Sequence, residues 1–425
     1  MVREYKDSGI TWIGRIPQDW NTTKLGSLYT QRNEKVSDKD YAPLSVTMQG
    51  ILPQLETAAK TDDGDNRKLV KKGDFAINSR SDRRGSCGIS PYDGSVSLIN
   101  TILKPRGEMN PNFYIWLFHT SPFADEFYKW GHGIVDDLWT TRWQEMKNIS
   151  VVIPSLEEQQ HIADYLDKKC AEIDGLIELQ EQMIAQLTDY KQSVITEAVT
   201  KGLNPNAELI PSGIDWIGTI PKGWTIGRIK NVAVLYGRIG FRGYTSEDLN
   251  KDGEGAITLS PSNMLPMGMD YSNVTYLSWT KYYESPEIMI QNNDLLMVKT
   301  GSSYGKVSYV NNLPREATIN PQILRIIPKI SSKYLGYFMQ SPIFLYQVEG
   351  GVVGGTIPTI AQEKINNFKI ILPPEHEQLA IVSLLDTKCT EIDSLISLKQ
   401  QKIENLKEYK KSIIFEAVTG KIIID

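Results

Sequence analysis

The 425-residue chain is poor in the residues that build disulfide frameworks and metal centres. It has three cysteines, Cys87, Cys170 and Cys389, which form no CxxC pair, and four scattered histidines. Because zinc sites need Cys or His ligands at short spacings, this composition argues against a metal centre. Cys170 and Cys389 are instead predicted to be small buried helix residues in a reducing compartment.

Long apolar segments are also missing. No run of 18 apolar residues occurs, and the chain does not open with a basic segment followed by an apolar one. The sequence therefore predicts a soluble, unexported protein of the cytoplasm with no membrane partner. Its length exceeds what one hydrophobic core serves and suits two or more domains.

Familiar catalytic signatures are absent as well. The sequence contains no GxSxG, no HExxH and no convincing cluster of nuclease carboxylates. Residues 301–307 imitate a phosphate-binding loop, but Val307 stands where Ser or Thr would hold magnesium. Residues 110–113 only partly match the Asn-Pro-Pro-aromatic motif of amino-methyltransferases, because the second proline is missing. We therefore expect no catalytic residues and no metal site in this chain.

What the chain does contain is an internal repeat. Residues 8–20 (SGITWIGRIPQDW) and 212–224 (SGIDWIGTIPKGW) are identical at 9 of 13 positions. Residues 154–200 and 373–419 are identical at 25 of 47 positions. The sequence between these matched ends diverges, and the second copy is longer by about 16 residues. A common frame with two different inserts is expected when the inserts recognise different things.

The repeat predicts four parts with different charge. They are a first domain (1–153), a first helical region (154–201), a linker with a second domain (202–371) and a second helical region (372–425). Residues 156–201 contain 4 Lys and Arg against 10 Asp and Glu, whereas residues 1–155 contain 20 against 19. The net charge of −5 therefore lies on the helical regions and leaves the inserts weakly basic, which suits a charged ligand.

Each repeated tail has an apolar stripe of helical period, predicting a helix of about 28 residues and roughly 40 Å. Such a stripe needs a partner along its length, and the nearest is the other copy, in an antiparallel coiled coil about a pseudo-twofold axis. The alternative is that each helix packs only on its own domain. The residues expected to pair the helices or dock a partner are Leu176, Ile177, Ile184, Leu187, Tyr190, Leu395, Ile396, Ile403, Leu406 and Tyr409.

Both inserts read as mixed α/β, so the predicted fold class is α+β, with two such domains and two long helices. Short strands are expected at residues 75–78 and 295–299, after the turns KKGD and QNND. Helices broken at Ser-Pro are expected at 112–130 and 333–348, and last strands at 149–153 and 368–372. The glycines between them (Gly131, Gly133, Gly350, Gly351, Gly354 and Gly355) are predicted to form turns.

The most basic stretch, residues 67–84, contains the first predicted strand (75–78) and most of the loop SRSDRRG (79–85) that follows it. Arginine side chains can engage phosphates, or bind guanine O6 and N7 bidentately in the major groove. The predicted DNA-binding residues here are Ser79, Arg80, Arg83, Arg84, Lys71 and Lys72. The alternative is a solvated loop without a ligand.

The second copy carries different hydrogen-bonding groups at the same place. The predicted DNA-binding residues of this loop are Lys299, Thr300, Ser302, Tyr304 and Lys306. Arg238 and Arg242, in the longer part of the second insert, are predicted phosphate contacts. Equivalent positions with different side chains are expected of two modules that read different sequences.

The order SGIxWIGxIPxxW, variable domain, PxxxEQxxI, EIDxLI and EAVT, occurring twice, closely resembles the specificity subunits of type I restriction–modification systems. The motif GTIPTI at residues 355–360 adds to the likeness. The resemblance implies that each variable domain recognises one half of a bipartite DNA site. It implies that the paired helices set the spacing between the domains and dock two modification subunits.

The same resemblance assigns the chemistry to other subunits. The modification subunits would carry S-adenosylmethionine and methylate adenine, and restriction subunits with ATP and Mg would join them. Double-stranded DNA and these subunits are the expected partners, and no cofactor is expected on this chain. The sequence pI of 5.6 predicts weak DNA binding by the chain alone.

Three other interpretations stay open. The chain could serve a different nuclease or methylase assembly or be a silent cassette, act alone as a methyltransferase or nuclease, or form a non-catalytic coiled-coil scaffold. The second predicts S-adenosylmethionine binding or metal-dependent cleavage by the pure chain. The third leaves the divergent loops at a common position unexplained.

Overall fold

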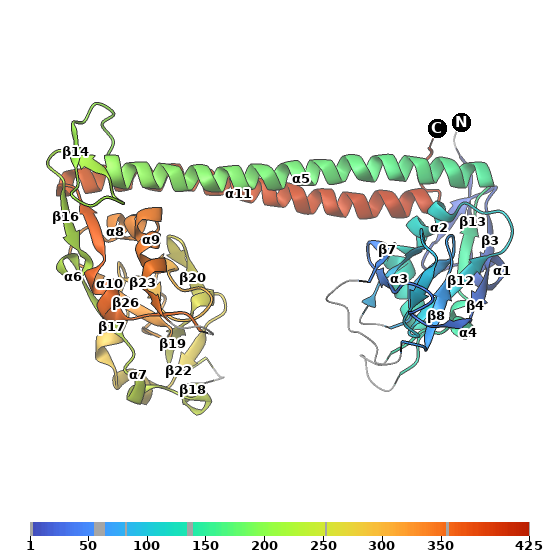
Figure 1. Cartoon of the computed structure of the whole chain (residues 1–425), viewed down its shortest axis with the longest axis horizontal. Helices are drawn as coiled ribbons and strands as arrows, with labels where there is room; N and C mark the ends of the chain where they lie inside the picture. The colour runs from blue at the N-terminus through green and yellow to red at the C-terminus, as the bar shows by residue number, and fades with distance from the viewer. Residues whose placement is uncertain are drawn as a thin grey trace. The chain divides into compact units, whose positions relative to one another are not determined.

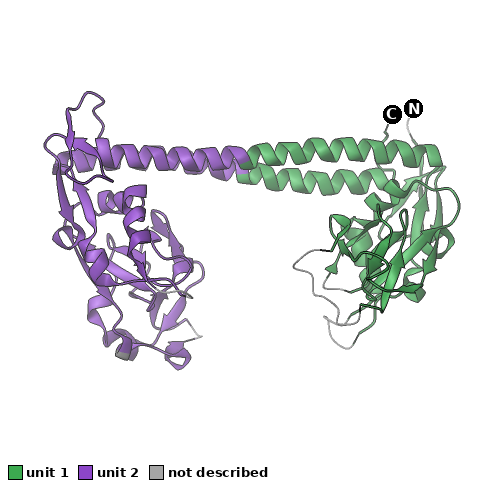
Figure 2. Ribbon diagram, in the orientation of Figure 1, with its two compact units in different colours: residues 1–181, 400–425 green, residues 182–399 purple. Residues whose placement is uncertain are grey.

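The computed structural model (Figure 1) describes residues 3–54, 64–80, 83–133, 139–250, 253–353 and 357–424. The chain forms two compact units (Figure 2). Unit 1 comprises Met1–Glu181 and Gln400–Asp425, and unit 2 comprises Gln182–Lys399. Each unit contains one mixed α/β domain and parts of two long helices. Ser81 and Asp82 of the arginine-rich loop, and Gly354 and Gly355 of the second glycine cluster, lie outside the described residues.

The domain of unit 1 is built on an antiparallel sheet of order β10-β9-β12-β4. Its strands are β4 (Tyr29–Arg32), β9 (Phe75–Asn78), β10 (Cys87–Ile89) and β12 (Asn100–Pro105). A second sheet contains β5 (Lys35–Val36), β8 (Arg67–Val70) and β11 (Gly94–Val96), and β6 (Leu44–Thr47) pairs with β7 (Gly50–Pro53). The strand predicted at residues 75–78 is confirmed as an inner strand of the main sheet.

The described part of this domain also contains the helices α1 (Leu25–Leu28), α2 (Pro111–Phe118), α3 (Ser121–Lys129) and α4 (Trp143–Met146). The predicted break between α2 and α3 is confirmed, because the Asn110 and Thr120 side chains each cap a new helix start. Phe118 of α2 packs on Phe75 of β9 with ring centroids 4.8 Å apart, and both are buried. This aromatic core places α3 beside the end of β9.

Short antiparallel pairs form the repeated frame at the edge of each domain. In unit 1, β1 (Tyr5–Asp7) pairs with β2 (Arg15–Pro17), and β3 (Asn21–Lys24) pairs with β13 (Ser150–Ile153). In unit 2, β14 (Leu209–Pro211) pairs with β15 (Thr219–Pro221), and β16 (Thr225–Arg228) pairs with β29 (Lys369–Leu372). Both predicted last strands are confirmed, and each insert enters and leaves on neighbouring strands.

The main sheet of unit 2 repeats this topology in the order β24-β23-β26-β17. Its strands are β17 (Ala233–Gly237), β23 (Leu295–Val298), β24 (Val307–Tyr309) and β26 (Ile323–Pro328). The helices are α6 (Ile229–Val232), α8 (Ser332–Met339), α9 (Pro342–Gly351) and α10 (Gln362–Asn367), and β27 (Val352–Val353) pairs with β28 (Thr359–Ile360). Strand β23 and the α8–α9 pair match the sequence predictions.

The second insert, like the first, contains a second sheet. It contains the sheet β18-β22-β19-β25, formed by β18 (Leu249–Asn250), β19 (Ala256–Leu259), β22 (Thr275–Leu277) and β25 (Ala317–Ile319). The pair β20 (Met264–Leu265) and β21 (Gly268–Met269), and helix α7 (Trp279–Tyr283), complete it. Buried residues of this part of the insert, including Ile257, Leu259 and Ile288, form a separate hydrophobic cluster.

One group of predicted turn residues is wrongly placed. Gly350 and Gly351 are the last two residues of α9 and do not form a turn. Gly351 fits there because it packs against Phe368, where a Cβ would lie only 3.0 Å from the Phe368 ring. Gly131 lies just after α3, where a side chain would collide with Trp139.

The two long helices, α5 (Leu156–Lys201) and α11 (Glu375–Val418), contain 46 and 44 residues. The prediction of about 28 residues was too short, because the first turns of each helix face a domain core and depart from the stripe. Ile162 and Leu166 of α5, for example, belong to the core of unit 1. None of the described helices has a segment long and apolar enough to cross a membrane.

The helices pair in an antiparallel coiled coil within both units (Figure 1). In unit 1 the Lys410 ammonium lies 2.7 Å from Asp174, and in unit 2 the Lys191 ammonium lies 2.7 Å from Asp393. The two aspartates are equivalent in the repeat, and so are the two lysines. Such reciprocal contacts are expected of a twofold interface, so the pseudo-twofold prediction is confirmed.

Candidate nucleic-acid interface

A buried ion pair fixes the start of the strand that leads to each candidate loop. In unit 1, Asp74 accepts from the Arg32 Nε at 2.6 Å, and in unit 2 Asp294 accepts from the Arg325 Nε at 2.7 Å. Both carboxylates stand in the Asp-containing turns that the sequence indicated, and both are buried. The far ends of β9 and β23 therefore leave the sheet at equivalent places.

The loop after β9 is tied to the segment around residues 139–141. Ser79 is buried, its Oγ lies 2.9 Å from the Thr101 Oγ1, and its carbonyl accepts from the Thr141 backbone N–H at 2.9 Å. Arg80 forms an isolated β-bridge with Thr140. Ser79 therefore holds the loop in position, whereas the Arg80 side chain is exposed.

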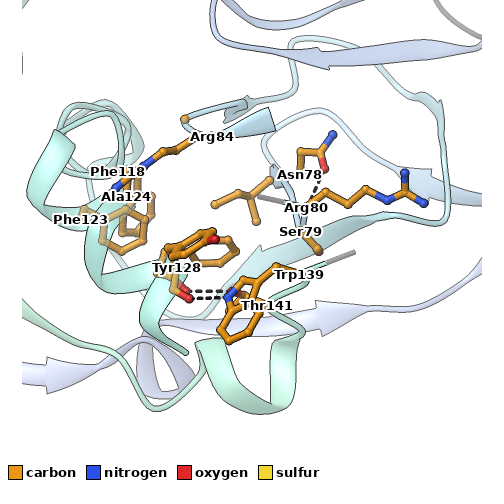
Figure 3. A pocket seen from close by; sticks show the side chains of 13 residues that line it. Asn78, Ser79, Arg80, Arg84, Phe118, Phe123, Ala124, Tyr128, Trp139 and Thr141 are labelled. Carbon is orange, nitrogen blue, oxygen red and sulfur yellow. Dashed lines mark hydrogen bonds between the residues drawn. The ribbon is translucent and has the colours of Figure 1, made fainter. Parts of the chain in front are cut away.

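Arg84 lies among aromatic side chains of α3 and the 139–141 segment (Figure 3). It forms an ion pair with Asp125, and its Cζ lies 5.8 Å from the Tyr128 ring centroid. The Tyr128 ring stacks on Trp139 at 5.7 Å, and the Trp139 Nε1 donates to the Tyr128 carbonyl at 2.8 Å. A small hollow of about 20 Å³ opens here, walled partly by Phe123 and Arg84.

The second loop is held by the same frame. Thr300 forms an isolated β-bridge with Thr359, and the Ile360 N–H donates to the Lys299 carbonyl at 2.9 Å. Thr300 and Thr359 correspond in the repeat to Arg80 and Thr140. Gly85 and Gly305, at the loop ends, have φ of 76° and 83°, a conformation that glycine adopts without strain. Thr359 and Ile360, the last two residues of the GTIPTI motif, therefore support this loop.

The predicted DNA-binding residues of the second loop differ in how exposed their side chains are. Ser302 is exposed, and Thr300, Tyr304 and Lys306 are half-buried, with the Lys306 ammonium donating to the Pro261 carbonyl at 3.2 Å. The Lys299 ammonium is half-buried and has no hydrogen-bond or ion-pair partner among the described residues. Burial lowers the pKa of Lys299, because desolvation disfavours its charged form.

Two predicted contacts lie away from the loop of unit 1. Lys71 and Lys72 are exposed, but they precede β9 and so lie at the opposite end of this strand from Ser79. Arg83 is exposed and directly precedes Arg84, which is also exposed. The structure therefore groups Ser79, Arg80, Arg83 and Arg84, and leaves the two lysines apart.

Arg238 and Arg242 have different surroundings. Arg238 is buried, and it donates from Nε to the Ile319 carbonyl at 3.2 Å and from its terminal nitrogen to the Thr318 Oγ1 at 3.0 Å. Burial lowers the pKa of Arg238. Arg242 is partly exposed and lies 3.5 Å from Glu287. Arg238 thus fastens its own segment to β25, and we leave it out of the interface.

The predicted stripe residues of the helices divide into two groups. Ile403 is buried, and Ile177, Ile184, Leu187, Ile396 and Leu406 are half-buried. In contrast, Leu176, Tyr190, Leu395 and Tyr409 are 45%, 55%, 47% and 49% exposed. The first group has the burial expected of residues that face the other helix. The second consists of two repeat-equivalent pairs that leave matched apolar surface on each helix.

The sequence reasoning missed Asp125, Tyr128, Trp139 and Thr141, which surround the arginine-rich loop. They are separated from Arg84 by 41 or more positions, so no local pattern connects them with it. The available signal was the repeat, since Thr140 and Thr359 occupy equivalent places. Within the described part of the chain, no group of three or more His, Cys, Asp or Glu residues could hold a metal ion.

Comparison with known proteins assigns the frame to a family. The model of the type I restriction modification DNA specificity domain matches residues 17–189 and, a second time, residues 221–408. The chain belongs to this specificity family. The two matches coincide with the two copies of the repeat, each including one insert and most of its long helix.

Relatives and solved structures of the specificity family resemble the chain over nearly its whole length. The type I restriction enzyme MjaVIII specificity subunit of Methanocaldococcus jannaschii is 25% identical, covering 96% of this chain and 94% of its own. The putative MjaX specificity subunit of the same organism is 24% identical, covering 99% and 98%. Both relatives therefore have a comparable length and domain order.

Two solved structures have the same fold. One, from work on complex assembly of the type I R-M system, has a TM-score of 0.73 at 15% identity and covers 96% of this chain and 99% of that one. The HsdS subunit from Thermoanaerobacter tengcongensis has a TM-score of 0.53 at 17% identity and covers 96% and 98%. At these identities the likeness establishes the fold.

Proposed function

We propose that this chain is the DNA specificity subunit of a type I restriction–modification complex, with one domain for each half of a bipartite site. The observation that carries the proposal is the pair of equivalent loops after β9 and β23. The same β-bridges hold both loops, Arg80 to Thr140 and Thr300 to Thr359. Their exposed side chains differ, so the two half-sites differ and the whole site is asymmetric.

The residues we assign to DNA contact follow from this placement. In the first half-site they are Arg80, Arg83 and Arg84, with Ser79 holding the loop. In the second they are Thr300, Ser302 and Tyr304, with Lys299 and Lys306 at the loop ends. Lys71 and Lys72, which are exposed at the other end of β9, are assigned to phosphates, which carry no sequence information. Arg242 is not assigned, because it lies 3.5 Å from Glu287.

The proposed partners dock on the helices. Leu176 with Tyr409 in unit 1, and Leu395 with Tyr190 in unit 2, are apolar, exposed and equivalent in the repeat. Equivalent surfaces suit two copies of one partner, the modification subunit. Exposed apolar surface on an otherwise acidic helix pair favours a protein partner over DNA.

In this proposal the chain itself is not an enzyme and acts in the cytoplasm. S-adenosylmethionine and adenine methylation belong to the modification subunits, and ATP and Mg belong to restriction subunits. The sequence supports this division, because it contains none of the catalytic motifs that either reaction uses. The paired helices set the number of unspecified base pairs between the half-sites.

The test is a map of methylated adenines in the host genome with the gene present and deleted. The proposal predicts that one asymmetric, bipartite motif loses its methylation on deletion. Copurification of the intact chain with a methyltransferase, in a 1:2 ratio, is the second expected result. A methyltransferase bound without a motif change would favour a different assembly. Sequence-indifferent DNA binding with no such partner would favour the coiled-coil scaffold.

A further inference from the structure

The Arg84 guanidinium is held from two sides in unit 1. Asp125 of α3 pairs with its terminal nitrogen, and the Tyr128 ring, one helical turn further along, lies against its Cζ at 5.8 Å. Tyr128 is in turn fixed by Trp139, which stacks on its ring and donates to its carbonyl. These contacts limit the plane in which the guanidinium can lie, while its side chain stays 50% exposed.

In unit 2 all three of the residues equivalent to Arg84, Asp125 and Tyr128 are different. The repeat places Tyr304 where unit 1 has Arg84, and Leu345 and Val348 where unit 1 has Asp125 and Tyr128. Gly305 confirms the equivalence, because a Cβ there would lie 2.9 Å from Val348 and 3.9 Å from Leu345. An ion pair in one copy is thus replaced by apolar neighbours in the other. The loop residue and the two α-helical residues beside it therefore differ together between the two copies.

The carboxylate beside Arg84 favours a base edge over a phosphate as the DNA ligand. A phosphate close to Asp125 would be repelled by a charge of the same sign. The guanine edge is neutral and offers two acceptors, O6 and N7, which a guanidinium with a fixed plane can bind together. Arg80 is different, since its guanidinium has no ion pair within the described residues and points away from Arg84 in Figure 3.

We propose that Arg84 recognises a guanine of the first half-site through its major-groove edge, with Asp125 and Tyr128 as positioning residues. This inference rests on the proposed function, because it requires that unit 1 reads a half-site. Arg84 supplies two N–H donors to O6 and N7. Asp125 and Tyr128 act through Arg84 and do not touch the base.

The experiment uses the complex of the full chain with its modification subunits and a duplex carrying the mapped site. Each guanine of the first half-site is replaced in turn by 7-deazaguanine, which lacks the N7 acceptor. One replacement should weaken binding by the wild-type complex by about 5-fold or more. The loss should stay below the roughly 150-fold of a whole bidentate contact, because O6 remains as an acceptor. The same replacement should have no further effect on the Arg84→Ala complex.

Conservative variants distinguish recognition of the guanine by Arg84 from a general effect of its positive charge. Arg84→Lys keeps the charge but loses the planar pair of donors, so it should lose discrimination at that guanine as Arg84→Ala does. Asp125→Asn and Tyr128→Leu should reduce the same discrimination partly, and leave discrimination in the second half-site unchanged. Arg15→Lys, at an exposed arginine of β2 outside the loop, is the matched control, and it should keep discrimination at that guanine.

Three results would overturn the inference. The first half-site has no guanine, or no 7-deazaguanine position depends on Arg84, or Arg84→Lys restores full discrimination, as expected of a phosphate contact. If the wild-type complex shows no sequence preference at all, the proposed function fails with it. A preference confined to the second half-site would remove only the inference on Arg84.

Discussion

At the scale of single residues, one hydrogen bond in each unit joins the repeated tryptophan motif to the repeated helical tail. The Trp20 Nε1 donates to Glu158 at 2.7 Å in unit 1, and the Trp224 Nε1 donates to Glu377 at 3.1 Å in unit 2. Both carboxylates stand in the first turn of a long helix, where free backbone N–H groups favour negative charge. This contact joins the last residue of the SGIxWIGxIPxxW motif to the PxxxEQ motif, so the two repeated motifs support each other.

Replacing Trp20 by Phe should destabilise unit 1 selectively. Phe keeps an aromatic ring in the core but removes the donor, and a hydrogen bond to a charged group contributes about 1.5–3 kcal/mol to the free energy of unfolding. Trp224→Phe is the matched control in unit 2. Amide hydrogen exchange, which resolves the two units, should show faster opening of unit 1 alone for Trp20→Phe. Equal effects of both variants on both units would contradict the assignment.

Other single residues show where sequence reasoning ends. Basic residues count alike in a sequence whether they face solvent or protein. Arg67 and Arg238 are buried, and Arg67 donates to the Ser95 Oγ at 2.8 Å, so neither belongs to the basic surface that the sequence suggested. Asp125 was missed for the opposite reason, since its pairing with Arg84 depends on how α3 packs against β9.

At the scale of elements, the local sequence pattern was sufficient to predict the short strands and the helix breaks, because neighbouring residues determine them. The strands β9 and β23 follow an Asp-containing turn and consist of buried residues, so their positions could be predicted within one residue. The helix pairs α2–α3 and α8–α9 break where Ser-Pro interrupts the pattern. The length of α5 could not be predicted, because its first turns change partner from the domain to the other helix.

The division of the helix stripe into shielded and exposed residues gives the second prediction. Ile392 of α11 is 3% exposed, whereas Leu395 and Leu398 are 47% and 63% exposed. Ile392→Ala should cost about 2–5 kcal/mol of stability, because it leaves a cavity between the helices. The double variant Leu395→Ala and Leu398→Ala should change stability by less than about 0.5 kcal/mol per site.

The double variant should nevertheless weaken binding of the modification subunit. Sedimentation of the chain with this subunit should show loss of one of two bound copies, because the equivalent surface at Leu176 and Leu179 is intact. Thermal unfolding of the same sample should match the wild type. Two copies still bound at wild-type affinity would remove these leucines from the docking surface.

At the scale of the whole molecule, neither copy of the repeat makes a unit by itself. Unit 1 takes its domain from the first copy, but its helix pair combines the first half of α5 with the second half of α11. Unit 2 has the reverse composition. Loss of either tail would therefore remove helix pairing from both units, whereas exchange of an insert leaves both helix pairs complete.

This composition predicts that the inserts can be exchanged. Residues 21–153 begin and end on paired strands, with Asn21 opposite Ile153 in β3 and β13. Replacing them with the equivalent segment of another family member should change one half of the methylated motif and leave the other half and the spacing intact. Exchange of residues 225–372, whose ends Thr225 and Leu372 also pair, is the matched control. A change in both halves after one exchange would contradict modular reading.

The spacing between half-sites gives the last prediction. Lengthening α5 alone would shift Asp174 and Lys191 relative to each other, so that both could not keep their partners on α11. Seven residues should instead be added to both helices, between residues 181 and 182 and between 399 and 400, where the units join. Seven residues make nearly two turns, which keeps the apolar stripe almost in phase and adds about 10 Å.

The paired insertion should change the number of unspecified base pairs in the methylated motif and leave both half-sites unchanged. The insertion in α5 alone is the control, and it should destabilise the chain because one set of helix contacts is lost. Sequencing of methylated adenines in cells carrying each variant provides the measurement. An unchanged spacing in a stable, active double-insertion variant would show that the helices do not set it, and that the partner subunits hold the two readers on DNA.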